Sequence, residues 1–173
     1  MIKEHELTLA ALKTAMKMEI DGKKYYQQLS KTGADEAGCK LFAALAAEED
    51  FHLKNFEQIF HVIESGQSWP QISSGDGHAG SSLGIFPQTS SGNRGSTGSA
   101  LKSVQKAMDM ENKTLDYYLE QSGKAVCMEE KEFYKAVAAQ ERVHHALLLD
   151  YFEFLKDPAQ WYTMKERHSL DGG

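Results

Sequence analysis

The sequence repeats itself at a fixed distance of 92 residues, and this repeat constrains the fold more than any other feature. The residues Glu19, Glu49 and His52 have identical counterparts 92 positions later, at Glu111, Glu141 and His144. An Ala-Met-x-Met-Glu motif followed by a Tyr-Tyr pair also occurs at 15–26 and again at 107–118. Self-similarity at one spacing is typical of a structural unit that is used twice. The chain is therefore predicted to contain two copies of one helical hairpin.

Apolar periodicity predicts four helices, at about 6–31, 37–64, 100–121 and 129–156. Short polar connections join the first two and the last two helices as antiparallel hairpins. Half of residues 65–100 are Gly or Ser, and this segment is long enough for a crossover if the third helix runs parallel to the second. That crossover spans about 40 Å for a helix of this length. The predicted fold is a single all-α domain over 1–173, a four-helix bundle of two hairpins.

Two apolar groups lie outside the predicted helices. We expect Ile85 and Phe86 to attach the middle of the crossover to the bundle. Pro158 ends the fourth helical pattern, and residues 157–173 form a C-terminal tail. We expect the tail's apolar residues to dock on the bundle or on a neighbouring subunit; these are Trp161, Tyr162 and Met164.

Composition excludes several classes of function. The net charge is −6 and no block of Lys or Arg occurs, so neither a nucleic-acid partner nor an anionic membrane is expected. No apolar run is long enough to cross a bilayer, and the charged N-terminus is unlike a signal peptide. Cys39 and Cys127 are too few for a disulfide framework. A cytoplasmic location is expected.

Six repeated residues are the candidate metal ligands: Glu19, Glu49, His52, Glu111, Glu141 and His144. Each falls within the apolar stripe of its helix, where an ionisable group needs a compensating partner. Equivalent residues lie at matching distances from the hairpin turns, so all six can meet near the middle of the bundle. One Glu-x-x-His on a helix is a weak motif and is usually a surface pair. Two copies, each preceded by an inward Glu 30 residues upstream, predict a centre in which four carboxylates balance two divalent cations.

Neighbouring polar residues are interpreted differently. Glu48 points away from the apolar stripe and its repeat counterpart is Gln140, so we expect Glu48 to be solvated. His145 has no partner in the first half and is expected to lie beside the ligands or at the surface. For Tyr26 and Tyr118 two interpretations stay open, because an inward Tyr can hydrogen-bond a ligand carboxylate or simply pack in the core.

The whole pattern resembles the rubrerythrin-like branch of the ferritin-like di-iron carboxylate superfamily. Proteins of this superfamily supply one Glu from each of two helices and a Glu-x-x-His from each of the other two. The resemblance implies a ferritin-like bundle and a carboxylate-bridged di-iron centre. It implies Glu19, Glu49 and His52 at one metal. It implies Glu111, Glu141 and His144 at the other, with two of the glutamates bridging.

The sequence departs from relatives of this kind at three places. Rubrerythrins carry a rubredoxin domain, which is not found in this sequence, so electrons are expected from a separate protein such as rubredoxin. Rubrerythrins place a further Glu one turn after the third-helix ligand, where this chain has Thr114. The ligand set thus resembles the symmetric one of bacterioferritins. Asp50 occupies the place of the haem-ligating Met of bacterioferritins, so no haem is expected.

The function expected from the resemblance is that of a non-haem oxidoreductase. Two iron ions, with manganese as the alternative, would reduce hydrogen peroxide or O₂ with electrons from the external donor, as in defence against oxidative stress. Two other interpretations stay open: a ferroxidase that stores or handles iron, and a non-enzymatic interaction module stabilised by metal. A homodimer or larger homo-oligomer is expected, and exchange of hairpins between chains stays open.

Overall fold

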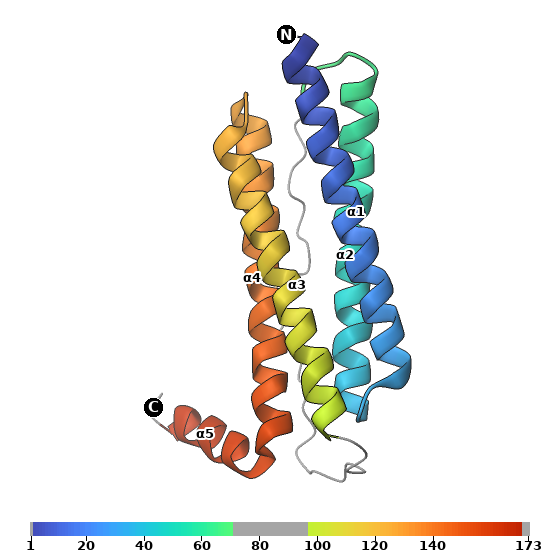
Figure 1. Ribbon diagram of the computed structural model, residues 1–173. Coiled ribbons are helices and arrows are strands. Elements are labelled where there is room, and N and C mark those ends of the chain that lie inside the picture. Colours follow the sequence, from blue (N-terminus) through green and yellow to red (C-terminus); the bar gives the residue numbers. More distant parts are fainter. Residues whose placement is uncertain (1, 71–96, 171–173) are drawn as a thin grey trace.

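Four long helices and one short helix make up the described part of the computed structural model, which covers residues 2–70 and 97–170, with side chains at 4–70 and 98–165 (Figure 1). The helices are α1 (Ile2–Thr32), α2 (Glu36–Glu64), α3 (Thr97–Lys124), α4 (Met128–Lys156) and α5 (Pro158–Leu170). The first four form two antiparallel hairpins, α1 with α2 and α3 with α4, that pack into one bundle. The predicted all-α four-helix bundle is confirmed.

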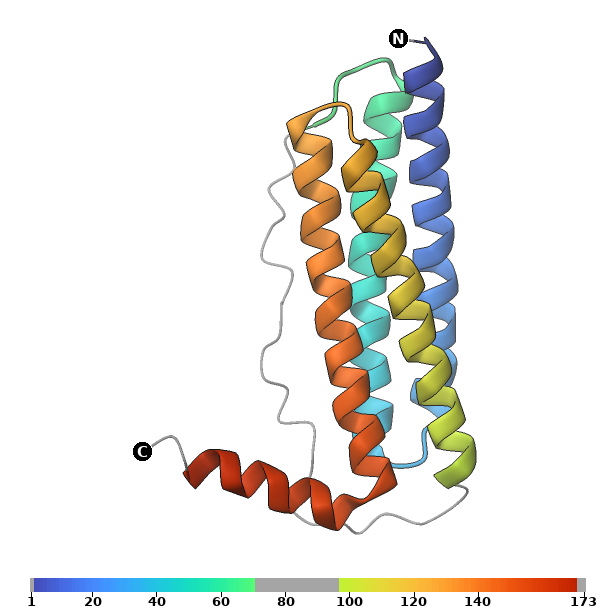
Figure 2. The same cartoon turned by 60° about the vertical axis from the view of Figure 1, so that its left-hand side comes forward.

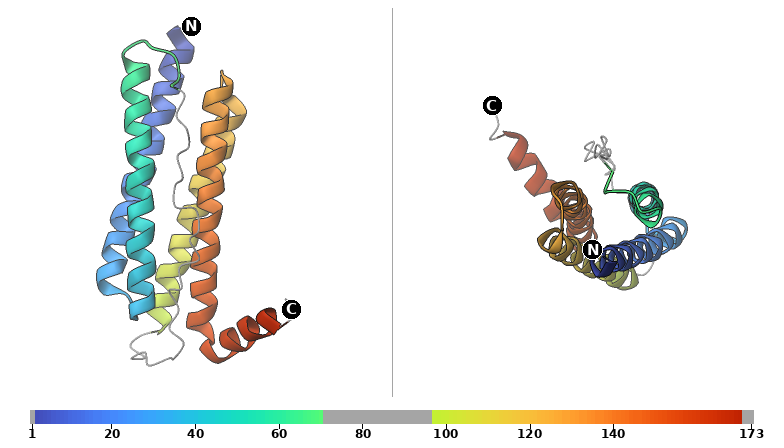
Figure 3. Two further views of the ribbon diagram at one scale, coloured as in Figure 1. Left: turned by 180° about the vertical axis from the view of Figure 1, so that it is seen from behind. Right: turned by 90° about the horizontal axis from the view of Figure 1, so that it is seen from above.

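The order of the helices matches the predicted crossover. Helix α2 ends at the end of the bundle where the chain begins, and α3 starts at the opposite end (Figures 1 and 2). Helices α2 and α3 therefore run in the same direction. Helix α1 contacts α2 and α3, and α4 also contacts both, so the four helices form a ring in the order α1, α2, α4, α3 (Figure 3). The predicted attachment through Ile85 and Phe86 lies outside the described residues.

Local sequence signals fix both ends of α2. Asp35 is the N-cap residue, and its side chain accepts a hydrogen bond from the Gly38 amide at 2.7 Å. At the C-terminus Gly66 has a φ of +79°, which a residue without a Cβ adopts readily. The Gly66 amide donates to the Ile63 carbonyl and the Gln67 amide to the Val62 carbonyl, which is the Schellman arrangement.

The C-terminal segment differs from the prediction because it contains a helix, α5, that points away from the bundle (Figure 2). Asp157 caps α5 by accepting a hydrogen bond from the Gln160 amide, and Pro158 occupies the first helical position. Asp157 and Pro158 therefore both end α4 and begin α5. Trp161 and Tyr162 pack on Phe154 of α4, as predicted, whereas Met164 is 57% exposed.

The apolar core consists of two clusters separated along the bundle axis. One cluster lies near the α1–α2 turn and includes Tyr26, Phe42, Leu45, Val104 and Leu148. The other lies toward the α3–α4 turn and includes Leu12, Phe56, Ile59, Tyr118 and Val137. The middle of the bundle therefore lies between two buried apolar layers.

The two Tyr-Tyr pairs connect the hairpins with the symmetry of the repeat. The Tyr25 hydroxyl donates to the Ser103 carbonyl at 3.0 Å, and the Tyr117 hydroxyl donates to the Ala11 carbonyl at 2.9 Å. Donors and acceptors are each related by the same 92-residue offset. The hairpins are therefore related by an approximate two-fold axis, and α1 and α3 are the helices joined by these bonds.

None of the helices in the described ranges combines the length and the apolar character that a membrane span needs.

Candidate metal centre

The six repeated Glu and His residues meet in the middle of the bundle, between the two apolar clusters. Each is at most 4% exposed. Helix α1 contributes Glu19, α2 contributes Glu49 and His52, α3 contributes Glu111, and α4 contributes Glu141 and His144. Every long helix therefore places at least one ionisable side chain in this buried layer, as the sequence predicted.

Their side-chain atoms form two overlapping groups, each compact enough to hold one metal ion. The first group is Glu19, Glu49, His52 and Glu141, and the second is Glu49, Glu111, Glu141 and His144. In each group the potential ligand atoms lie within 4.8 Å of one another. Glu49 and Glu141 belong to both groups, so these two glutamates would be shared if each group held a cation.

Each imidazole Nδ1 faces a set of carboxylate oxygens. His52 Nδ1 lies 3.4 Å from Glu19 Oε2, 3.4 Å from Glu49 Oε2 and 3.3 Å from Glu141 Oε1. This nitrogen therefore faces one oxygen from each of three helices.

His144 Nδ1 faces the other oxygens of the shared glutamates. It lies 3.7 Å from Glu49 Oε1, 3.3 Å from Glu141 Oε2 and 3.7 Å from Glu111 Oε2. Each shared carboxylate thus turns one oxygen toward each histidine, as a bridge between two cations requires. The two imidazole rings stack with their centroids 5.6 Å apart.

Several potential ligand atoms of the two groups have no hydrogen-bond partner in the described part of the chain, as expected of atoms that bind cations. Both Nδ1 atoms, both Glu141 oxygens and Glu19 Oε2 are buried without a hydrogen-bond partner among the described residues. Buried polar atoms in native proteins are normally satisfied. Ligands about 2.1 Å from a common ion lie roughly 3.0–3.5 Å apart. All three oxygens around His52 Nδ1 have this spacing, and the two more distant oxygens around His144 Nδ1 lie slightly farther away, at 3.7 Å. The two clusters are therefore consistent with a dinuclear metal site.

Burial and mutual repulsion shift the protonation of the cluster. Burial and then the charge of Glu141 raise the pKa of Glu111 to about 8, and burial with the Glu19 and Glu141 charges raises the pKa of Glu49 well above its usual value. Burial opposes ionisation of Glu141 as well, but its contacts with both histidines lower its pKa. These shifts favour the protonated, neutral forms of Glu49 and Glu111 over their ionised forms.

The histidine pKa values shift for the same reason. Burial alone would lower them, but the surrounding carboxylates outweigh burial and raise the pKa of His52 and His144 well above the usual value. A metal ion that binds at Nδ1 must therefore displace a proton.

Two tyrosines hold the unshared glutamates across the hairpin interface. The Tyr26 hydroxyl donates to Glu111 Oε1, and the Tyr118 hydroxyl donates to Glu19 Oε1. Burial and the nearby carboxylates raise the pKa of both tyrosines well above the usual value, so both remain protonated donors near neutral pH. Of the two interpretations open for these residues, hydrogen bonding to the cluster glutamates is confirmed.

One contact of this layer escaped the sequence interpretation. Gln140, considered only as the counterpart of Glu48, places its Oε1 atom 2.7 Å from His52 Nε2. The available signal was its place next to Glu141 on α4. Glu48 itself is half-buried rather than fully solvated. His145 is half-buried and belongs to neither group.

The positions one turn after Glu19 and Glu111 differ between the halves. Gly22 is buried, and a Cβ built there would lie 3.5 Å from Glu49 Oε1, in ordinary contact. Its counterpart Thr114 donates its hydroxyl to the Met110 carbonyl on its own helix. Neither position supplies a further carboxylate to the centre.

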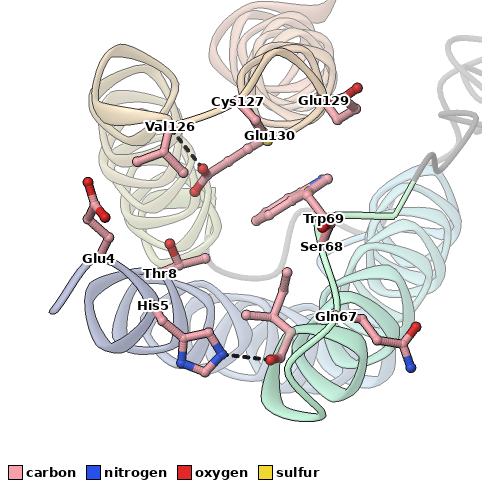
Figure 4. Close-up of a pocket in the computed structure, with 11 residues that line it drawn as sticks. Glu4, His5, Thr8, Gln67, Ser68, Trp69, Val126, Cys127, Glu129 and Glu130 are labelled. Atoms are coloured by element: carbon pink, nitrogen blue, oxygen red, sulfur yellow. Dashed lines mark hydrogen bonds between the residues drawn. The ribbon is translucent and has the colours of Figure 1, made fainter. Parts of the chain in front are cut away.

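A separate pocket of about 350 Å³ lies at the end of the bundle near the α3–α4 turn (Figure 4). Trp69 lines this pocket, and the centroid of its ring lies 5.9 Å from that of Phe133 and 6.0 Å from that of Tyr134. Glu130 also lines the pocket and accepts a hydrogen bond from the Val126 amide (Figure 4). None of the six buried residues lines this pocket, so it covers the end of an apolar cluster rather than the centre.

Comparison with known families matches the N-terminal part of the chain. Residues 10–74 match the family model described as Rubrerythrin. The matched range contains Glu19, Glu49 and His52 and covers most of the first hairpin; the internal repeat relates the second hairpin to it. Neither the search of curated proteins nor the search of solved structures gave a match.

Proposed function

We propose that this chain, whose residues 10–74 match the rubrerythrin family model, is a di-iron oxidoreductase that reduces hydrogen peroxide or O₂ with electrons from a separate donor protein. The observation that carries the proposal is the pair of buried groups that share Glu49 and Glu141. Carboxylate-rich groups with one imidazole each favour iron or manganese over softer metals. Two adjacent iron ions supply two electrons together, the number needed to reduce hydrogen peroxide and two protons to two molecules of water.

The protein's own residues have distinct tasks in this proposal. Glu49 and Glu141 would bridge the two ions, while Glu19 and Glu111 would each bind one. Tyr26 and Tyr118 fix the orientation of these terminal carboxylates through the hydrogen bonds described above. The apolar layers on both sides exclude water, which strengthens the electrostatic interactions within the centre.

The proposal is tested on protein purified without oxygen. Metal content per chain is counted, Fe(II) is added, and oxidation of the iron is followed by absorbance after mixing with peroxide or with O₂. Two iron ions per chain, oxidised rapidly and re-reduced by a rubredoxin over many cycles, support the proposal. Iron accumulating far beyond two per chain indicates the ferroxidase alternative, and no redox response indicates a structural metal site.

A matched pair of variants on α3 makes the test specific to the centre. Glu111→Gln removes a buried carboxylate, whereas Asp109→Asn removes an exposed one two residues away. We expect Glu111→Gln to reduce iron oxidation at least tenfold and Asp109→Asn to leave it unchanged. Equal rates in both variants would contradict the assignment of the centre. The predicted homo-oligomer is measured on the same preparations by light scattering.

A further inference from the structure

The two ring nitrogens of His52 have different surroundings. Nδ1 faces the carboxylates of Glu19, Glu49 and Glu141, whereas Nε2 faces a single group, Oε1 of Gln140, at 2.7 Å. Gln140 comes from α4 and His52 from α2, so the contact crosses between the hairpins. The His52 side chain is fully buried, and Gln140 is half-buried.

The chemistry of the amide determines which nitrogen of a neutral His52 carries the proton. A carbonyl oxygen accepts hydrogen bonds and cannot donate them. A neutral imidazole with Nε2 beside that oxygen therefore places its hydrogen on Nε2 and its lone pair on Nδ1. The lone pair then points into the group formed by Glu19, Glu49 and Glu141, where a metal ligand is required.

The internal repeat makes this contact a difference between the two halves. Most residues around the centre have an identical or similar counterpart, but Gln140 corresponds to Glu48. At this position the second half of the repeat carries a neutral amide where the first half carries a carboxylate. A neutral acceptor orients the imidazole without adding negative charge to the first metal position.

We propose that Gln140 is a positioning residue that fixes the tautomer and ring orientation of His52 and so completes the metal position formed with Glu19. The inference rests on the proposed metal centre but not on its redox activity. Orienting partners of this kind change metal affinity by about 10–100-fold when they are removed. Loss of Gln140 is therefore expected to weaken one of the two metal positions and to spare the other.

The test uses Zn(II), a diamagnetic probe that gives sharp NMR spectra and undergoes no redox chemistry. In the full chain labelled with ¹⁵N-histidine and loaded with Zn(II), we expect His52 to show an Nε2-bound proton that exchanges slowly with solvent. Gln140→Met keeps the length of the side chain but removes the acceptor. In this variant the proton signal should disappear, and calorimetry should show one of two Zn(II) ions bound about 10–100-fold more weakly.

Two further variants separate positioning from a general structural role. Gln140→Glu restores an acceptor and should restore the slow proton, whereas Glu48→Gln, at the repeat-equivalent position, should leave the His52 signal in place. A Gln140→Met protein that retains the His52 proton and both affinities overturns the inference and leaves the proposed centre standing. A wild-type chain that fails to bind two Zn(II) ions overturns both.

Discussion

Tyr118 shows how much one hydroxyl contributes at the residue scale, because its ring packs in the core while its oxygen donates to Glu19. We expect Tyr118→Phe to lower the free energy of unfolding by about 1.5–3 kcal/mol, the range for a buried hydrogen bond to a charged group. Urea unfolding of the metal-loaded protein measures the change. The adjacent Tyr117→Phe loses a bond to a backbone carbonyl and should cost only about 0.5–1.5 kcal/mol. Equal decreases in unfolding free energy for the two variants would mean that the bond to Glu19 stabilises the protein no more than the bond to a backbone carbonyl.

Tyr134 presents the opposite case, a buried hydroxyl without a partner among the described residues. The repeat places Phe42 at the equivalent position, and each of these rings packs beside the cluster-facing Tyr of its half. An unsatisfied buried polar group costs about 1–3 kcal/mol, so Tyr134→Phe is expected to preserve or raise stability. Thermal unfolding of the variant checks this expectation. A clear fall in the melting temperature would show that the hydroxyl has a partner after all.

At the scale of single helices, the sequence predicted the four long helices well because apolar periodicity and hairpin geometry act locally. Their observed bounds lie within a few residues of the prediction. Apolar periodicity does not predict helix α5 because its apolar residues, Trp161 and Tyr162, form no sustained stripe, and a proline both ends one helix and can begin the next. The meeting of the six Glu and His residues followed from the repeat. The contact of Gln140 with His52 did not, because it depends on the rotation of α4 against α2.

Gly38 in the first turn of α2 is required by close packing between helices. A Cβ built there would overlap the hydroxyl oxygen of Tyr151 on α4, which donates to the α2 cap residue Asp35. Gly38→Ala must displace the Tyr151 ring, and we expect it to destabilise the protein by about 1–3 kcal/mol. The matched control is Gly123→Ala near the end of α3, where a Cβ meets nothing within 4 Å. That control should gain about 0.5–1 kcal/mol from the better helix propensity of Ala. Chemical denaturation of both variants distinguishes the outcomes.

At the scale of the whole molecule, the layer that is least favourable to bury lies between the two apolar clusters that hold the bundle together. One apolar cluster stabilises each end of the bundle, whereas the middle layer contains four buried carboxylates and two buried imidazoles. A hydrophobic layer of similar volume would make the folded metal-free protein more stable. The metal-free fold is therefore expected to tolerate this layer only with protons in place of cations.

Stability of the metal-free protein should consequently fall as the pH rises. The pKa of Glu111 is raised from 4.5 to about 8 in the folded state, so the folded protein binds more protons than the unfolded chain between these values. Glu49 shifts in the same direction, and the raised pKa values of His52 and His144 add stability that is lost as they deprotonate. The free energy of unfolding decreases with rising pH wherever the folded state binds more protons than the unfolded state.

The expected result is a melting temperature that falls steadily between about pH 5 and pH 8 without metal, in line with the linkage between protonation and folding. With Fe(II) or Zn(II) present this slope should shrink or reverse, because cations replace the protons and bind more tightly as the ligands deprotonate. Calorimetric scans across this pH range, with a chelator and with added metal, measure both slopes. The Glu111→Gln variant should flatten the metal-free slope, since it removes one of the titrating groups without removing the bundle. A metal-free protein whose stability rises with pH over this window would mean that the carboxylates are ionised and satisfied by other means.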